Sequence, residues 1–215
     1  MTYTGDVDAY GPADFRVLPD VLVAKMGLGP AGVNGYLLRC LRTEEQLLVD
    51  AADDPLFVAA ISSSRSLETI VTTHAHASHT AALQHLTEAT HAAVVAHAAD
   101  AHDLPVPPSR LVGDGDVVQV GDVPLTVVHL PGHSPGSIAL LYRPTDGSAP
   151  HLFTGDALLR GGAGRTATAE DGARLEAALQ EKVFRALPDE TWVYPGHGPD
   201  TTVGRERARA DTLVS

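Results

Sequence analysis

Cysteine is almost absent from this chain of 215 residues, and Cys40 is its only thiol. A single cysteine cannot form a disulfide within the chain, which favours a protein of a reducing compartment. Cys40 lies in the apolar run Tyr36–Leu41, and free cysteines in such runs are usually small buried residues. We therefore interpret Cys40 as part of the core rather than as a nucleophile.

Long hydrophobic runs are absent as well. No apolar stretch approaches the roughly 20 residues of a membrane-spanning helix. The segment Met1–Tyr10 is acidic and lacks the apolar region of a signal peptide. The sequence therefore predicts a cytoplasmic protein that does not bind membranes.

Positive charge is in short supply. The chain has 15 Lys and Arg against 27 Asp and Glu, a net charge of -12, so nucleic acid and anionic lipid would be repelled. An anionic small molecule stays compatible, because a bound metal would dominate the field around it. We expect a small-molecule substrate and no nucleic-acid partner, while the sequence leaves the oligomeric state open. With 44% hydrophobic residues and no linker, residues 1–215 are interpreted as one domain.

Short apolar or β-branched segments, separated by turns rich in Gly and Pro, predict strands through much of the chain. Helices are predicted at residues 55–64, at His79–Ala89 and at Glu170–Leu187. The last is the clearest, since Leu or Val recurs every fourth residue from Leu175 to Leu187. In each half of the chain, strands precede a helix. This order predicts a mixed α/β fold with two sheets packed face to face and helices outside.

Six potential metal ligands directly follow strand-like segments. The densest group is Thr-His-Ala-His-Ala-Ser-His at residues 73–79, after the strand Glu68–Thr72. The complete set is His74, His76, His79, His133, Asp156 and His197. Imidazole nitrogens suit Zn²⁺, and also Fe or Mn, and one carboxylate among them can bridge two ions. The other six histidines lie in helices or apolar strands, and we interpret them as surface or hydrogen-bonded core residues.

Together these segments resemble the metallo-β-lactamase superfamily, whose pattern is H-x-H-x-D-H, P-G-H-[ST]-P-G-S, F-T-G-D and Y-P-G-H-G. The corresponding segments are His74–His79, Pro131–Ser137, Phe153–Asp156 and Tyr194–Gly198. The similarity is strongest to the short hydroxyacylglutathione-hydrolase (glyoxalase II)-like branch. It implies a four-layer αββα sandwich of two mixed sheets. It also implies a first metal site from His74, His76 and His133, a second including His79 and His197, and Asp156 bridging both.

Ser78 departs from this pattern, because the family has an aspartate there that binds the second metal. A hydroxyl is a poorer ligand than a carboxylate and cannot act as a base near neutral pH. The resemblance therefore implies one or two Zn²⁺ ions, with a weakened second site. The candidate catalytic residues are Asp156 and, at the position of the family aspartate, Ser78. Arg165 is a candidate anchor for a substrate carboxylate.

The resemblance implies hydrolysis of a thioester, ester or lactone by a metal-bound hydroxide. Two alternatives stay open. The segments Gly155–Leu159 and Gly164–Thr166 resemble those of persulfide dioxygenase, a mononuclear iron enzyme of the same fold. Alternatively, Ser78 marks a metal-binding protein of this fold that has lost catalysis.

Overall fold

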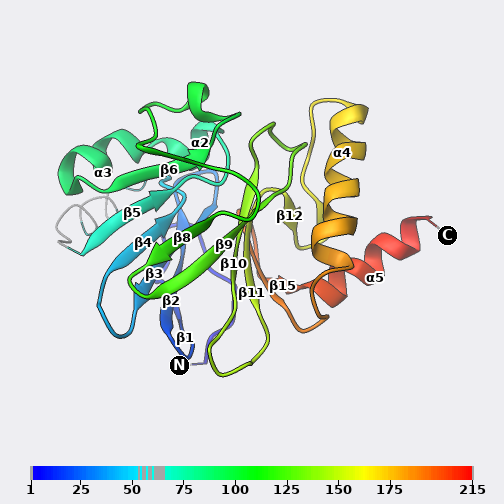
Figure 1. Ribbon diagram of the computed structural model, residues 1–215, viewed down its shortest axis with the longest axis horizontal. Coiled ribbons are helices and arrows are strands. Elements are labelled where there is room, and N and C mark those ends of the chain that lie inside the picture. The colour runs from blue at the N-terminus through cyan, green and yellow to red at the C-terminus, as the bar shows by residue number, and fades with distance from the viewer. Residues whose placement is uncertain (1, 53, 55–56, 58–59, 61–65, 215) are drawn as a thin grey trace.

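Two β-sheets face each other, and helices cover their outer faces (Figure 1). The computed structural model describes residues 2–52, 54, 57, 60 and 66–214. The helix predicted at residues 55–64 falls almost wholly outside these residues. No described helix has the length and apolar character needed to cross a membrane. The interpretation of residues 1–215 as one domain stays a prediction.

The first sheet contains the N-terminal strands in the order β1 to β7. These are β1 (Asp14–Val17), β2 (Val21–Leu28), β3 (Val33–Cys40), β4 (Gln46–Val49), β5 (Leu67–Val71), β6 (Ala93–His97) and β7 (Arg110–Val112). Strands β1 to β4 pair antiparallel, whereas β4 to β7 pair parallel, so the sheet is mixed. Parallel pairing brings the carboxyl ends of β4, β5 and β6 to the same edge.

The second sheet has the order β15-β14-β11-β10-β9-β8. Its strands are β8 (Val117–Val120), β9 (Val123–His129), β10 (Ile138–Tyr142), β11 (His151–Gly155), β14 (Trp192–Pro195) and β15 (Thr201–Thr202). Strands β11 and β14 pair parallel and the others antiparallel, so this sheet is also mixed, as predicted. A separate hairpin, β12 (Leu158–Leu159) and β13 (Gly162–Ala163), follows β11.

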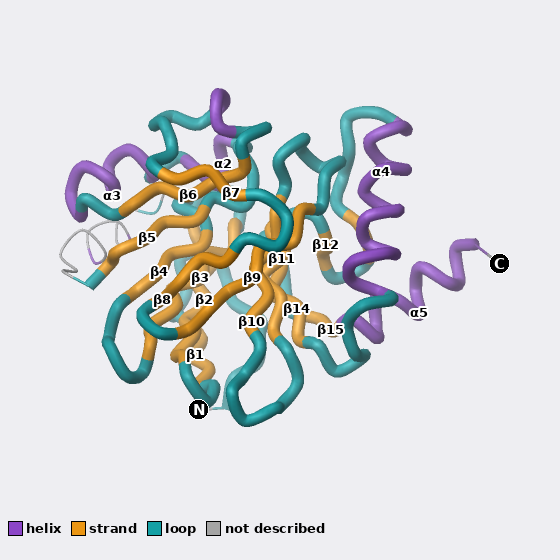
Figure 2. Tube along the Cα trace, viewed as in Figure 1, coloured by secondary structure: helices purple, strands orange, loops and turns teal. Residues whose placement is uncertain are grey.

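Helices lie on both outer faces (Figure 2). They are α2 (Ala77–Thr80), α3 (Leu83–Thr90), the short 3-10 helix η1 (Ala101–Asp103), α4 (Ala169–Leu179) with its π-helical continuation η2 (Gln180–Phe184), and α5 (Val203–Val214). The helix predicted at His79–Ala89 was wrong in its limits, since helical structure begins at Ala77 and is divided between α2 and α3.

The helix predicted at Glu170–Leu187 is not α-helical throughout. An α-helix has 3.6 residues per turn, so side chains spaced four residues apart rotate by about 40° at each step. A repeat from Leu175 to Leu187 would therefore drift off the face that contacts the sheet. The wider π turn of η2 offsets this drift, and both Val183 and Leu187 are buried.

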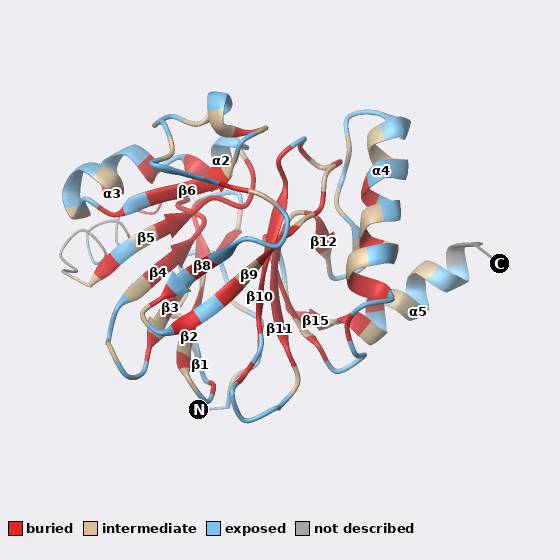
Figure 3. Cartoon of the chain, viewed as in Figure 1, coloured by how far each residue is buried: buried red, intermediate tan, exposed pale blue. Residues whose placement is uncertain are grey.

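Three layers of buried apolar residues hold the sandwich together, and Figure 3 shows buried residues along the strands of both sheets. The central layer lies between the sheets and includes Leu38, Leu125 and Phe153. A second layer includes Ile70 of β5 with Leu83 of α3, and the third packs α4 against the second sheet. Cys40 is 1% exposed and belongs to the central layer, which confirms its interpretation as a core residue.

The buried His151 predicts a loss of stability in mild acid. It is 4% exposed, and its Nδ1 lies 3.0 Å from the Tyr194 hydroxyl. Burial, and then the charge of Arg16, lower the pKa of His151 to about 4. In the unfolded chain His151 binds a proton below about pH 6.5, whereas the folded protein keeps it neutral. The stability that depends on neutral His151 is therefore complete above that pH and is lost as the pH falls toward 4. Between pH 7 and pH 5 we expect a loss of about 2 kcal/mol in the free energy of unfolding.

Urea unfolding at a series of pH values would measure this loss in the wild type and in His151→Gln. The variant should lose about 2 kcal/mol less over the same interval. Parallel pH profiles for the two proteins would contradict the assignment to His151.

Candidate metal centre

Five imidazoles and one carboxylate meet at one edge of the sandwich, where strands of both sheets end. His74, His76 and His79 follow β5, and His133 lies in the β9–β10 loop. Asp156 directly follows β11 and His197 follows β14. Because β11 and β14 are parallel neighbours, their carboxyl ends bring these last two residues together.

The first cluster contains His74, His76 and His133, whose candidate ligand atoms lie within 4.8 Å of one another. His133 Nε2 is 2.9 Å from His76 Nδ1. On its other side, His133 Nδ1 is 2.7 Å from the Arg165 carbonyl oxygen and must donate to it. The lone pair of His133 therefore lies on Nε2, the nitrogen that faces the cluster.

A relay of hydrogen bonds sets His74 in the same way. The Thr73 hydroxyl donates to Asp50 Oδ2 at 2.8 Å and lies 3.0 Å from His74 Nδ1, from which it accepts. The lone pair of His74 is then on Nε2. That atom is buried and has no hydrogen-bond partner among the described residues.

The second cluster contains His79, Asp156 and His197. His79 Nε2 is 3.2 Å from His197 Nε2, and both rings are held from behind. His79 Nδ1 lies 2.9 Å from Asp50 Oδ2, and His197 Nδ1 donates to the Gly32 carbonyl at 3.1 Å. This is the arrangement of metal-binding histidines, in which the distal nitrogen bonds an acceptor that fixes the ring.

Asp156 lies between the two clusters. Its Oδ2 is 3.7 Å from His133 Nε2 and 3.5 Å from His197 Nε2, and its Oδ1 is 3.6 Å from His79 Nε2. Burial raises the pKa of Asp156, but the surrounding imidazoles outweigh it, with His79 foremost, and keep the carboxyl ionised. Burial lowers the pKa of His79, whereas Asp50 and Asp156 raise it to about 9.

This donor set fits a divalent cation. Asp156 Oδ1 and His74 Nε2 are buried polar atoms without a hydrogen-bond partner among the described residues, which is costly unless something else pairs with them. A cation accepts lone pairs from both and neutralises the buried carboxylate. Three imidazoles with a shared carboxylate are ligands that Zn²⁺, Fe and Mn take.

Two glycines allow the loops to approach this closely. Gly132, which precedes His133, has a φ of +140°, and a Cβ there would collide with the backbone of α4 at Asp171. Gly196, which precedes His197, lies so close to Asp156 Oδ1 that a Cβ would overlap it. Only a residue without a side chain fits either position.

Ser78 and Arg165 lie differently from the six candidate ligands. Ser78 is exposed in α2, and its hydroxyl makes no hydrogen bond to any residue that the structure describes. The Arg165 side chain is also exposed, and the contact that the structure shows is the bond from its backbone carbonyl to His133. The roles of both side chains stay predictions.

Sequence reasoning missed Asp50, the carboxylate that holds Thr73 and His79 from behind the clusters. Asp50 is buried at the end of β4 with a φ of +60°, a left-handed conformation that aspartate tolerates. It accepts from the Thr73 amide at 2.8 Å as well as from Thr73 Oγ1 and His79. The available signal was the strand ending Val49-Asp50, which parallels the ending Gly155-Asp156 in the other half.

A buried network holds the loop of His197 against the first sheet. Lys25 is 0% exposed, and its Nζ lies 2.6 Å from Asp200 Oδ1 and donates to the Gly198 carbonyl at 2.8 Å. Asn34 Nδ2 donates to the carbonyls of Pro195 and Gly198 at 2.9 and 2.7 Å. Side chains of β2 and β3 therefore set the position of a residue at the end of β14.

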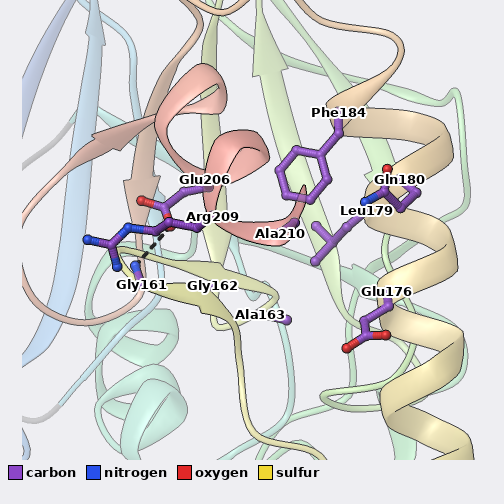
Figure 4. Close-up of a pocket in the computed structure, with 10 residues that line it drawn as sticks. All are labelled: Gly161, Gly162, Ala163, Glu176, Leu179, Gln180, Phe184, Glu206, Arg209 and Ala210. Atoms are coloured by element: carbon purple, nitrogen blue, oxygen red, sulfur yellow. Dashed lines mark hydrogen bonds between the residues drawn. The ribbon is translucent and has the colours of Figure 1, made fainter. Parts of the chain in front are cut away.

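An apolar cavity of about 220 Å³ lies elsewhere, between α4 with η2, α5 and the β12–β13 hairpin (Figure 4). Leu179 and Phe184 line it on one side and Ala210 on another. Glu206 at its end accepts a hydrogen bond from the Gly161 amide at 3.0 Å. The cavity lining includes none of the residues of the two clusters.

Comparison with known proteins yields consistent matches. The family model described as the metallo-beta-lactamase superfamily matches residues 28–197. Hydroxyacylglutathione hydrolase of Rhodospirillum rubrum is 34% identical over 163 residues, or 75% of this chain. The chain spans only 60% of the length of that relative.

Two solved structures are similar along most of their length. The BLEG-1 B3 metallo-beta-lactamase is 28% identical with a TM-score of 0.76, and the match covers 89% of this chain and 99% of that one. ETHE1 from Myxococcus xanthus is 32% identical with a TM-score of 0.72, covering 87% and 82%.

Proposed function

We propose that this chain, which belongs to the metallo-β-lactamase superfamily, is a metal-dependent hydrolase that cleaves a thioester, ester or lactone. The observation that carries the proposal is the convergence of five imidazoles on Asp156, with the outward-facing nitrogens of His133, His74, His79 and His197 all held by acceptors. Similarity to a hydroxyacylglutathione hydrolase supports the thioester among these substrates.

Zinc is the metal that we propose, with one or two ions, and Fe or Mn as alternatives. His74, His76, His133 and Asp156 would hold the first ion, and His79, His197 and Asp156 a second. When bound, such an ion polarises a carbonyl and lowers the pKa of a coordinated water toward neutrality. Asp156 stays ionised in its imidazole surroundings, while the exposed Ser78 offers only a hydrogen bond. We assign Arg165 the binding of a substrate carboxylate. The partner is a small molecule, and we place the protein in the cytoplasm.

Metal content and turnover test this proposal together. Freshly purified protein should contain zinc or a related metal by mass spectrometry and should hydrolyse members of a panel of thioesters, esters and lactones. His133→Ala should lose metal and activity, whereas His102→Ala, a matched change at a side chain 77% exposed, should retain both. Protein without metal, and without turnover when zinc or manganese is restored, would refute the proposal.

A mononuclear iron persulfide dioxygenase is the second candidate. The observation that favours it is Ser78, because the second cluster then has three described ligand residues, of which Asp156 is the carboxylate. Asp50 lies nearby but already accepts hydrogen bonds from Thr73 and His79. Oxygen consumption with a thiol persulfide separates the two activities. An active preparation free of iron excludes the dioxygenase.

Ser78→Asp should strengthen the second metal site. A carboxylate at this position adds a charged ligand beside His79, and we expect affinity for a second ion to rise on the order of 10-fold, about 1.4 kcal/mol. Titration of metal-depleted protein against a chelating dye measures both binding steps. The control is Ser148→Asp, the same change at an exposed serine between β10 and β11, which should leave both steps unchanged.

An unchanged second step in Ser78→Asp would show that position 78 does not determine the number of ions. If the wild type is inactive on every panel substrate and Ser78→Asp is active, the chain is instead a metal-binding protein that has lost catalysis.

A further inference from the structure

We propose that Asp100 is a positioning residue that sets the geometry of the first cluster by joining the two loops that carry it. The inference rests on the proposed function, because it concerns how His74, His76 and His133 are held ready for a metal. Nothing in the sequence pattern marks Asp100, which lies between β6 and η1.

Asp100 is 3% exposed, and both of its carboxylate oxygens accept hydrogen bonds. Oδ2 accepts from the Ala75 amide at 3.1 Å and from the Ser134 hydroxyl at 2.6 Å. Oδ1 accepts from the Gly136 amide at 2.6 Å. These three donors stabilise its buried oxygens.

The donors come from the two loops of the first cluster. Ala75 lies between His74 and His76, while Ser134 follows His133 directly. Strand β6 is the parallel neighbour of β5, so the turn after β6 reaches the loop after β5 at the same sheet edge. The β9–β10 loop belongs to the other sheet, and Asp100 therefore bridges the two sheets at the cluster.

The contact is built for close approach. A Cβ on Gly136 would lie 2.7 Å from Asp100 Cγ, so only glycine fits there without displacement. Ser137 Oγ accepts from the Ser134 amide at 3.0 Å and lies 2.8 Å from Ser134 Oγ, which holds that hydroxyl in place. The separation of His76 and His133 depends on this junction, and metal sites require such positions to within about 0.5 Å.

Asp100→Asn tests the inference, because it keeps the shape but replaces one acceptor oxygen with a donor. Whichever way the amide turns, an NH₂ group then faces the Gly136 amide or the Ala75 and Ser134 donors. We expect affinity of the first cluster for Zn²⁺ to fall by about 10- to 100-fold. The measurement is chelator competition with metal-depleted protein in a His197→Ala background, which leaves the second cluster without one of its ligands.

Asp20→Asn is the matched control. Asp20 also accepts three hydrogen bonds, from Tyr142 Oη at 2.7 Å, Thr145 Oγ1 at 2.6 Å and the Thr145 amide at 3.1 Å. Asp20 contacts Tyr142 at the carboxyl end of β10, whereas the His133 loop leads into the other end of this strand. The zinc affinity of Asp20→Asn in the His197→Ala background should equal that of the background alone.

Zinc affinity of Asp100→Asn within about twofold of the background would overturn the role of Asp100. If Asp100→Asn does not fold, Ser134→Ala removes a single donor and should weaken zinc binding by about 3- to 10-fold, and an unchanged affinity there overturns the role equally. Failure of the wild type to bind zinc or any related metal refutes the proposed function itself, which is a different result.

Discussion

Asp156→Asn is expected to lower kcat/KM on the substrate found by the panel by about 10³-fold or more. Asp156 lies between the two clusters, with oxygens 3.5 to 3.7 Å from His79, His133 and His197. Asparagine loses the negative charge that would balance the proposed metal, and one of its two terminal atoms is no longer a ligand. A metal contributes several kcal/mol of transition-state stabilisation, and about 4 kcal/mol corresponds to this factor.

Steady-state kinetics with metal analysis of the same samples would measure the effect. The matched control is Asp103→Asn, where the carboxylate is 63% exposed and close to the surface residue His102. It should leave kcat/KM and metal content unchanged. An Asp156→Asn variant that binds the wild-type amount of metal and retains kcat/KM within about tenfold would contradict the central position of Asp156.

Lys25→Met is expected to lower the free energy of unfolding by about 3–5 kcal/mol. The Lys25–Asp200 pair is almost fully buried, with side chains 0% and 1% exposed. Burial is the largest influence on both groups, lowering the pKa of Lys25 and raising the pKa of Asp200. The Tyr3 hydroxyl and the Trp192 indole also donate to Asp200, which helps to stabilise the charged form of this buried pair. Methionine fills a similar volume but leaves that carboxylate without its cation.

Urea unfolding would measure the loss, and two further variants define its cause. Arg39→Met breaks an exposed pair with Glu44, with side chains 42% and 70% exposed, and should cost less than about 1 kcal/mol. The double variant Lys25→Met with Asp200→Leu should be more stable than Lys25→Met alone, because the buried charge is gone. Equal stability of the single and double variants would mean that an unpaired charge is not the cause.

Much of the fold could be predicted because its signals are local. Alternating apolar residues and glycine turns mark strands such as β8 and β9, and each candidate ligand follows its own strand in the sequence. The limits of helices were less accurate. The π turn at Gln180–Phe184 places Val183 and Phe184 in the third apolar layer, a tertiary contact that the local pattern does not specify. The break between α2 and α3 also has no signal in the apolar pattern.

The residues of the candidate site were likewise only partly predictable from the sequence. Ligand types and strand-end positions are properties of the sequence, and the structure brings His74, His76 and His133 together and places Asp156 toward both clusters. Their binding of metal stays a prediction. Asp50, Asp100 and Lys25 were not predicted, because each acts on residues from 20 to 175 positions away.

The sequence by itself determined the family, the alternation of strands and helices and the set of nitrogen and oxygen donors, since these depend on short motifs and on local hydrophobic patterns. Tertiary structure alone decided which nitrogen of His79, His197 and His133 faces the clusters, because the acceptors behind these rings, Asp50, Gly32 and Arg165, come from distant segments. It also decided which buried carboxylates join the loops, because burial and hydrogen bonding between two sheets exist only after they pack.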